Sequence, residues 1–334
     1  MTGSCRSTGS PTALRWYYEK EFNPATVENN EFGTPKMFGK NQQITTLAIR
    51  NNPEHLYGYG TRSVVDVVPK QFEGALGVEW TLSNPYIFYA LLGEAPEPSS
   101  FENVIKTFTF NQGFCVKSMQ MDLGLKLREK DVDLSIYGIC VNSLSLNANV
   151  NEIVNCSLDG LFRDYAKAVV TEESDITPAE EGVGFAPYVF HHGSVVCSDV
   201  EEGTVQTFSL DISNNLLMQY GVGDRHPQNV VPQQLDITAS LDTTFDDIEF
   251  LDIVKTMGKQ TSITLTFNNG KSGEDEREIE ITLEDIWYEE FNPTIQYNVP
   301  LTHNIPIRVG KITVVSKDMD DPDEVYGLTA PPPE

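Results

Sequence analysis

The stretch that decides the fold is VKSMQMDLGLKLREKDVDLSIYGICVNSLSLN, residues 116–147. Apolar residues of one parity alternate there with polar residues or glycine: Met119, Met121, Leu123, Leu125 and Leu127. A period of two places such side chains on one face of a β-strand. The charged residues 128–131 predict a turn, after which a second long strand follows. The stretch therefore predicts two long β-strands with a buried face.

Strand-like patterns continue on both sides of this stretch. The second strand is expected to pair with residues 152–161, EIVNCSLDGL, across a turn near 148–151. One short helix is predicted at IFYALL, because Asn84 can cap it, Pro85 suits its first turn and Gly93 ends it. A second is predicted from Thr243 or Thr244 to Gly258. The fold class is therefore mainly β, with short helices.

The order of a strand, a helix that ends in glycine, a further strand and an amphipathic strand occurs twice. It begins near Phe72 and again near Gln234. The repetition predicts a tandem duplication of one β domain, each copy with a short helix, and chance similarity between β-rich segments is the alternative. The predicted divisions are an extended N-terminal arm, a first β domain, a linker, a second β domain and an acidic, proline-rich tail: 1–35, 36–165, 166–184, 185–316 and 317–334.

The chain is strongly acidic. Its 334 residues include 49 acidic and 23 basic ones, for a net charge of −26. Affinity for nucleic acid comes largely from lysine and arginine, which displace counterions from the phosphates. The charge therefore argues against a protein that grips DNA, but it suits a surface past which DNA must slide.

Cysteines and hydropathy indicate the compartment in which the chain folds. Its five cysteines are odd in number, widely spaced and without a CxxC pair, which predicts free thiols formed in a cytoplasm. No apolar run is long enough for a membrane span, and the first residues lack the apolar core of a signal peptide. We expect neither secretion by that route nor a membrane-spanning segment.

No motif in the sequence has the spacing of a catalytic, cofactor or metal site. His191, His192 and Cys197 have the residue types of a zinc site, but adjacent histidines of a strand point to opposite faces and a fourth ligand is missing. GKS at 270–272 lacks the first glycine of a phosphate-binding loop and joins two strands. We therefore predict no enzyme, no cofactor and no bound metal.

Aromatic residues are frequent in the N-terminal segment. They are Trp16, Tyr17, Tyr18, Phe22 and Phe32. Exposed apolar segments tend to become ordered against a partner, so these residues predict an assembly arm that contacts a neighbouring subunit. The alternative is that the segment packs on its own domain.

Three stretches resemble the major tail tube protein of long-tailed, siphovirus-like viruses of bacteria or archaea. They are YGYGTRSVVDVVPKQFEGALGVEW (57–80), APYVFHHGSVV (186–196), and residues 207–242, in which a strand ending in ISN leads through a loop with glycine and proline to the next strand. The similarity extends over roughly Tyr57 to Val315. It lies in the order of strands, turns and loops and not in catalytic residues.

The resemblance implies a structural subunit with tail-tube-type β-sandwich domains whose sheets join between subunits into an inner barrel. Rings would stack into a conduit for DNA, with arms or loops that lock ring to ring. The implied partners are further copies of the chain and other tail proteins, and DNA would pass without specific binding. The implied location is the virion tail, assembled in the host cytoplasm. A duplicated domain predicts three chains per ring, and a single domain predicts six.

Alternate positions of the long strands are the candidates for the lumen wall. They are Gln120, Asp122, Glu278, Glu280 and Thr282. Lys126 and Arg128 fall on the same parity and count against a wholly acidic wall. Two other classes stay open: a neck or decoration protein of the same virion, and a soluble carbohydrate-binding or carbohydrate-active β-sandwich.

Overall fold

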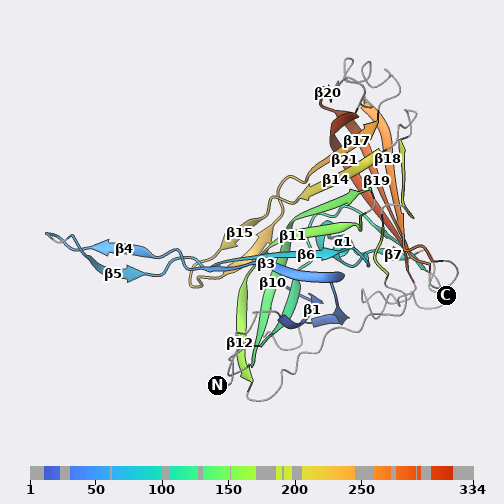
Figure 1. Cartoon of the computed structure of the whole chain (residues 1–334). Helices are drawn as coiled ribbons and strands as arrows, with labels where there is room; N and C mark the ends of the chain where they lie inside the picture. Colours follow the sequence, from blue (N-terminus) through green and yellow to red (C-terminus); the bar gives the residue numbers. More distant parts are fainter. Residues whose placement is uncertain are drawn as a thin grey trace, which may run out of the picture.

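A computed structural model describes residues 11–22, 31–60, 62–98, 106–126, 131–150, 152–170, 186–189, 192–197, 205–244, 259–271, 276–290, 292–294 and 302–318. Almost all regular structure in these ranges is β-strand, with one short helix, as predicted (Figure 1). The second predicted helix, the predicted linker after Val170 and the tail after Asp318 lie outside the described residues. None of the described helices is long and apolar enough to cross a membrane.

The central strand of the molecule is β10 (Asp131–Asn149), the second half of the stretch that opened the sequence argument. Its first half pairs with β9 (Met119–Lys126) on one edge and β12 (Asp164–Val170) on the other. Its second half pairs with β14 (Val205–Ser213) and β11 (Asn155–Phe162). The partners of β10 change near Gly138. This residue has a φ of +64°, which favours glycine, and a side chain there would collide with Arg163. One strand therefore belongs to two sheet regions.

The first sheet region has the order β2–β1–β9–β10–β12. The two strands at one end of it, β1 (Pro11–Glu19) and β2 (Glu31–Lys36), come from the segment predicted as an arm. β12 likewise lies partly within the predicted linker, 166–184. The described parts of both segments are therefore built into the sheet.

The second sheet region is wider and runs through both halves of the chain. From β10 it continues on one side through β11 to β6 (Glu73–Thr81) and β3 (Lys40–Arg50). On the other side it continues through β14 to β17 (Asp236–Thr244) and β21 (Thr302–Asp318). Beyond β21 lie β19 (Glu278–Tyr288), β18 (Lys259–Asn268) and β13 (Ser194–Cys197). The short strands β8 (Lys106–Phe110), β7 (Glu97–Pro98) and β20 (Asn292–Thr294) complete the edges around β21.

The core lies between the layers and is rich in aromatic rings. Trp16 of β1 lies 5.5 Å from Phe38, and Phe38 lies 5.2 Å from Trp80 of β6, measured between ring centroids. The helix α1 (Ile87–Leu92) is buried on every side, as its wholly apolar sequence requires. Gly93 ends it in the left-handed conformation, as predicted, and donates its N–H to the carbonyl of Tyr89.

Candidate assembly arm and conduit face

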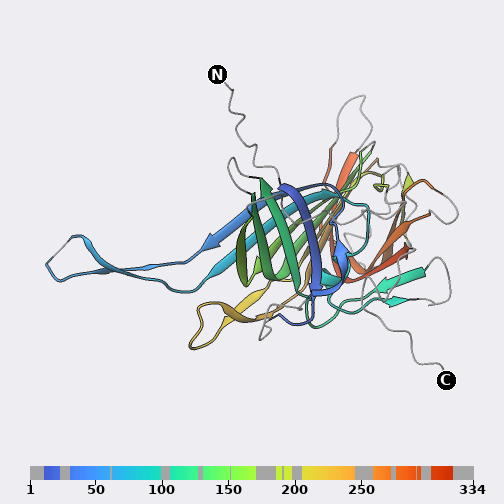
Figure 2. The ribbon, with the colours of Figure 1, turned by 90° about the horizontal axis from the view of Figure 1, so that it is seen from below.

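A long β-hairpin projects far from the body of the molecule (Figures 1 and 2). It consists of the end of β3, the strands β4 (Glu54–Tyr57) and β5 (Val64–Val68), and the approach to β6. We call residues 50–70 the assembly arm. Every residue of β4 and β5 is exposed, although most are apolar or aromatic. An isolated two-stranded ribbon is at best marginally stable in water, and exposed apolar surfaces of this kind are typical of protein–protein contacts.

The tip of the arm carries two exposed tyrosines, each followed by a glycine. Tyr57 is 64% exposed and Tyr59 fully exposed. Gly60 has a φ of +81°, which favours glycine at this turn. Within the arm, three basic and two acidic residues give a net charge of +1, whereas the rest of the chain carries −27. The arm is thus apolar and slightly basic on a strongly acidic molecule.

A second hairpin holds the root of the arm. It consists of β15 (Leu217–Tyr220) and β16 (Pro227–Val231). Phe72 donates its backbone N–H to the carbonyl of Arg225 at 2.9 Å, and the Tyr220 hydroxyl donates to the carbonyl of Phe72 at 2.9 Å. The Arg225 guanidinium reaches Asn51 across the arm. We call this contact the brace, because it fixes where the arm leaves the body.

Charged groups surround the brace. The His226 ring lies 5.1 Å from that of Phe72, and its Nδ1 lies 2.9 Å from a carboxylate oxygen of Asp224. The His226 backbone N–H and ring hold the pKa of Asp224 below its usual range. Arg163 donates to the carbonyl of Pro227 at 3.1 Å and so ties the second hairpin to the end of β11.

The outward face of the wide sheet is made almost wholly of small polar side chains. We call it the conduit face, and on its five central strands it consists of Glu79, Ser143, Ser145, Asn147, Asn149, Asn155, Ser157, Asp159, Thr207, Ser209, Asp211, Ser213, Asp236, Thr238, Ser240 and Asp242. Five of these are carboxylates, and no lysine or arginine occurs among these outward positions. Figure 1 shows the strands that carry them running across the body of the molecule.

Hydrogen bonds between strands fix the polar side chains of the conduit face. Thr207 donates to Asp242 at 2.6 Å, and the hydroxyls of Ser209 and Ser240 lie 2.8 Å apart. Ser145 also donates to Asp211. Hydroxyls bound to neighbouring strands present a hydrated acidic surface without long side chains. These five strands themselves offer a polyanion no cation to bind; at their edge, Arg308 of β21 is paired with Asp236.

The predicted lumen residues lie in two different environments. Glu278, Glu280 and Thr282 are half-buried on the outward face of β19, and Ile279 and Ile281 point into the core. Gln120 and Asp122 are 4% and 5% exposed, and Asp122 accepts hydrogen bonds from Ser135 and Arg15. Their burial argues against the lumen-facing role predicted for these two residues.

The N-terminal aromatics pack mainly inside the subunit. Trp16 and Tyr18 are fully buried and Tyr17 is 7% exposed. Phe22 is half-buried close to Gly138, and for Phe32 only the backbone is described, paired with β1. Of the two alternatives for Trp16, Tyr17 and Tyr18, the structure supports packing on the chain's own domain. A role of the segment in assembly stays a prediction.

Sequence reasoning missed both the assembly arm and the conduit face. A signal for the arm existed in VVDVV after the glycine-flanked tyrosines, since adjacent β-branched residues favour strands. The conduit face could have been read from serine, threonine, asparagine and aspartate at alternate positions of five strands. Among the described residues, no group of three or more histidine, cysteine or acidic side chains is placed to hold a metal ion.

Comparison with known proteins gives a family match. A family model described as phage tail tube protein matches residues 23–297, which is most of the chain. The match covers β2 to β20, and with them the assembly arm and all of the conduit face. No curated protein matches the chain.

Proposed function

Because the chain belongs to the phage tail tube protein family, we propose that it assembles in the host cytoplasm into stacked rings whose channel conducts DNA out of the virion. The chain is a structural subunit of the viral tail that assembles with further copies of itself and with other tail proteins. In this proposal it has no catalytic role, and it binds neither cofactor nor metal.

The conduit face is the observation that carries the proposal. It joins β6, β11 and β10 from the first half of the chain to β14 and β17 from the second. A continuous polar wall across the subunit suits the inside of a channel, because it repels phosphates and holds water. Glu278, Glu280 and Thr282 lie on the outward surface of β19, which β21 with the exposed Arg308 separates from the conduit face.

The continuity of the conduit face through both halves of the chain supports a ring of three chains. With two tube-type domains per chain, three chains would supply six similar wall segments. Six chains per ring is the alternative if the two halves are not a duplication. In either case we propose that the assembly arm reaches a neighbouring copy, since it projects beyond its own body (Figure 2).

Electron microscopy of the purified protein tests this function. The wild-type chain is expected to form hollow tubes. A variant in which residues 53–69 are replaced by a two-residue turn should stay a folded, unassembled subunit, because those residues lie outside the core. A wild-type chain that stays monomeric at high concentration, or a truncated chain that still forms long tubes, would contradict the proposal.

A further inference from the structure

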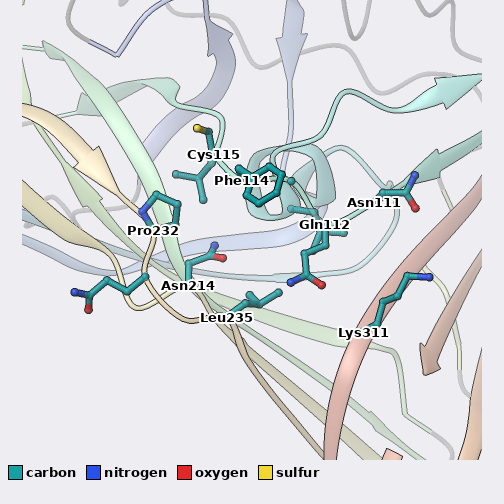
Figure 3. A pocket seen from close by; sticks show the side chains of 12 residues that line it. Asn111, Gln112, Phe114, Cys115, Asn214, Pro232, Leu235 and Lys311 are labelled. Carbon is teal, nitrogen blue, oxygen red and sulfur yellow. The ribbon is translucent and has the colours of Figure 1, made fainter. Parts of the chain in front are cut away.

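A cavity opens beside the end of α1, between the two halves of the chain (Figure 3). Its volume is about 560 Å³. Apolar and amide side chains line it together with one charged side chain, Lys311, which is paired with Glu284; Phe114, Leu92, Pro232 and Leu235 belong to the apolar part. An aromatic ring with a polar end fits a cavity of this mixed kind.

The wall that carries Phe114 is held firmly by backbone contacts. Gly113 donates its N–H to the carbonyl of Leu92 at 2.8 Å, and Gly93 forms a β-bridge with Gln112. A side chain at Gly93 would collide with the carbonyl oxygen of Cys115, so the loop lies directly on the helix end. Phe114 is nevertheless fully exposed and Cys115 is exposed beside it.

The floor of the cavity is equally well built. Asn214 is 5% exposed and donates to the carbonyls of Leu91 and Val141, each at 3.0 Å. Its own carbonyl accepts the N–H of Gln233 at 3.1 Å, which fixes the opposite wall. The cavity is therefore a preformed site, and it leaves one whole phenylalanine ring without cover.

We propose that this cavity receives the tyrosine tip of the assembly arm of a second copy of the chain. Tyr57 and Tyr59 at the tip have exposed rings that can cover the Phe114 ring, and hydroxyl ends that suit the amide side chains of the cavity. The arm cannot fill its own cavity, since it points away from its own body in both views (Figures 1 and 2).

Charge and symmetry support a second copy as the occupant. An arm of net charge +1 is attracted to a body of −27, whereas two bodies repel each other. A tip on one surface that enters a cavity on another surface is a head-to-tail contact, and such contacts close into rings or continue into filaments. The inference rests on the proposed tube assembly and names the surface that the arm binds.

Cross-linking through the natural Cys115 tests the contact. Gly58→Cys places a thiol at the arm tip and keeps both tyrosines. Tubes of this variant, treated with a short bismaleimide, are expected to give a ladder of linked chains in which residues 58 and 115 are joined, as identified by mass spectrometry. The Gly58→Cys, Cys115→Ser double variant should give no ladder. A ladder that persists without Cys115, or tubes that form with no 58–115 link, would overturn the inference and leave the proposed function standing.

Substitution of the exposed ring provides a second test. Phe114→Ser changes a fully exposed side chain, so the subunit should keep its stability, while the concentration needed for tube formation should rise about tenfold or more. The control is Val196→Ser, which alters an exposed apolar residue of β13 that belongs neither to the cavity nor to the brace. Equal effects of the two substitutions would contradict docking at Phe114.

Discussion

At the scale of single residues, Trp16 and Tyr59 show how differently aromatic side chains are used in this chain. Trp16 is fully buried against Tyr18 and Phe38, whereas Tyr59 is fully exposed at the arm tip. Trp16→Ala should lower the free energy of unfolding of the isolated subunit by about 3–5 kcal/mol, because it leaves a cavity in the core. Tyr59→Ala should change it by less than about 0.5 kcal/mol but weaken assembly. Urea denaturation and electron microscopy measure the two effects, and an unaltered subunit stability in Trp16→Ala would contradict the packing described.

Glu19 is a buried carboxyl group at the end of β1. It is 1% exposed and accepts a hydrogen bond from the N–H of Gly138, and burial raises its pKa to about 7 in spite of Lys117 and Arg163 nearby. An acid whose pKa is higher in the folded state stabilises the fold below its unfolded pKa near 4.5, and this contribution is lost as the pH rises through 7. The free energy of unfolding of the wild-type chain should therefore fall by up to about 3 kcal/mol between pH 5 and pH 8. Glu19→Gln should remove this fall.

Denaturant unfolding at several pH values checks this expectation. The control is Glu290→Gln, because Glu290 is exposed. If Glu19→Gln keeps the full pH dependence of the wild-type chain, the buried carboxyl is not its source.

At the scale of elements, the brace determines how firmly the assembly arm is held. Tyr220→Phe removes the hydroxyl that donates to the carbonyl of Phe72 and should cost about 1 kcal/mol. Hydrogen exchange of the Phe72 amide, which is bonded to Arg225, should then become roughly five times faster. Tyr165→Phe is the control, since it keeps the ring that stacks on Phe72. Equal exchange rates in the two variants would show that the hydroxyl does not secure the brace.

The elements that face the chain's own core were predictable from sequence. The alternation in β9 and β10, the β10–β11 pair and the helix between Pro85 and Gly93 are confirmed. Each depends on a local rule, either a period set by burial or a residue that ends a helix or makes a turn. The tandem duplication stays a prediction.

The elements that were missed have no such period. Trp16, Tyr17 and Tyr18 are consecutive and all buried, because both faces of β1 are covered. The sequence of β1 therefore lacks the alternation of apolar and polar residues that predicts a strand. In the arm, Val64, Val65, Val67 and Val68 are all exposed, and periodicity reports only burial within the same chain. A surface that binds another subunit, as we propose for the arm, would leave no pattern of this kind.

At the scale of the whole molecule, the separation of charge should control assembly. Arg50→Glu together with Arg62→Glu changes the arm from +1 to −3 and should slow tube formation about tenfold or more at low salt. The difference from wild type should narrow as salt screens the charges. Lys167→Glu with Lys271→Glu makes the same change in net charge away from the arm and is the control. Light scattering measures the rates, and equal slowing by both pairs would show that only net charge matters.

The orientation of the conduit face in the assembled tube is the most direct test of the account. A cryo-electron microscopy reconstruction of the tube should place Ser157, Asp211 and Ser240 on the lumen wall, with three chains in each ring and each arm seated on a neighbouring copy. A tube in which these three residues face the outside, or in which a lysine- and arginine-rich surface lines the channel, would contradict the account.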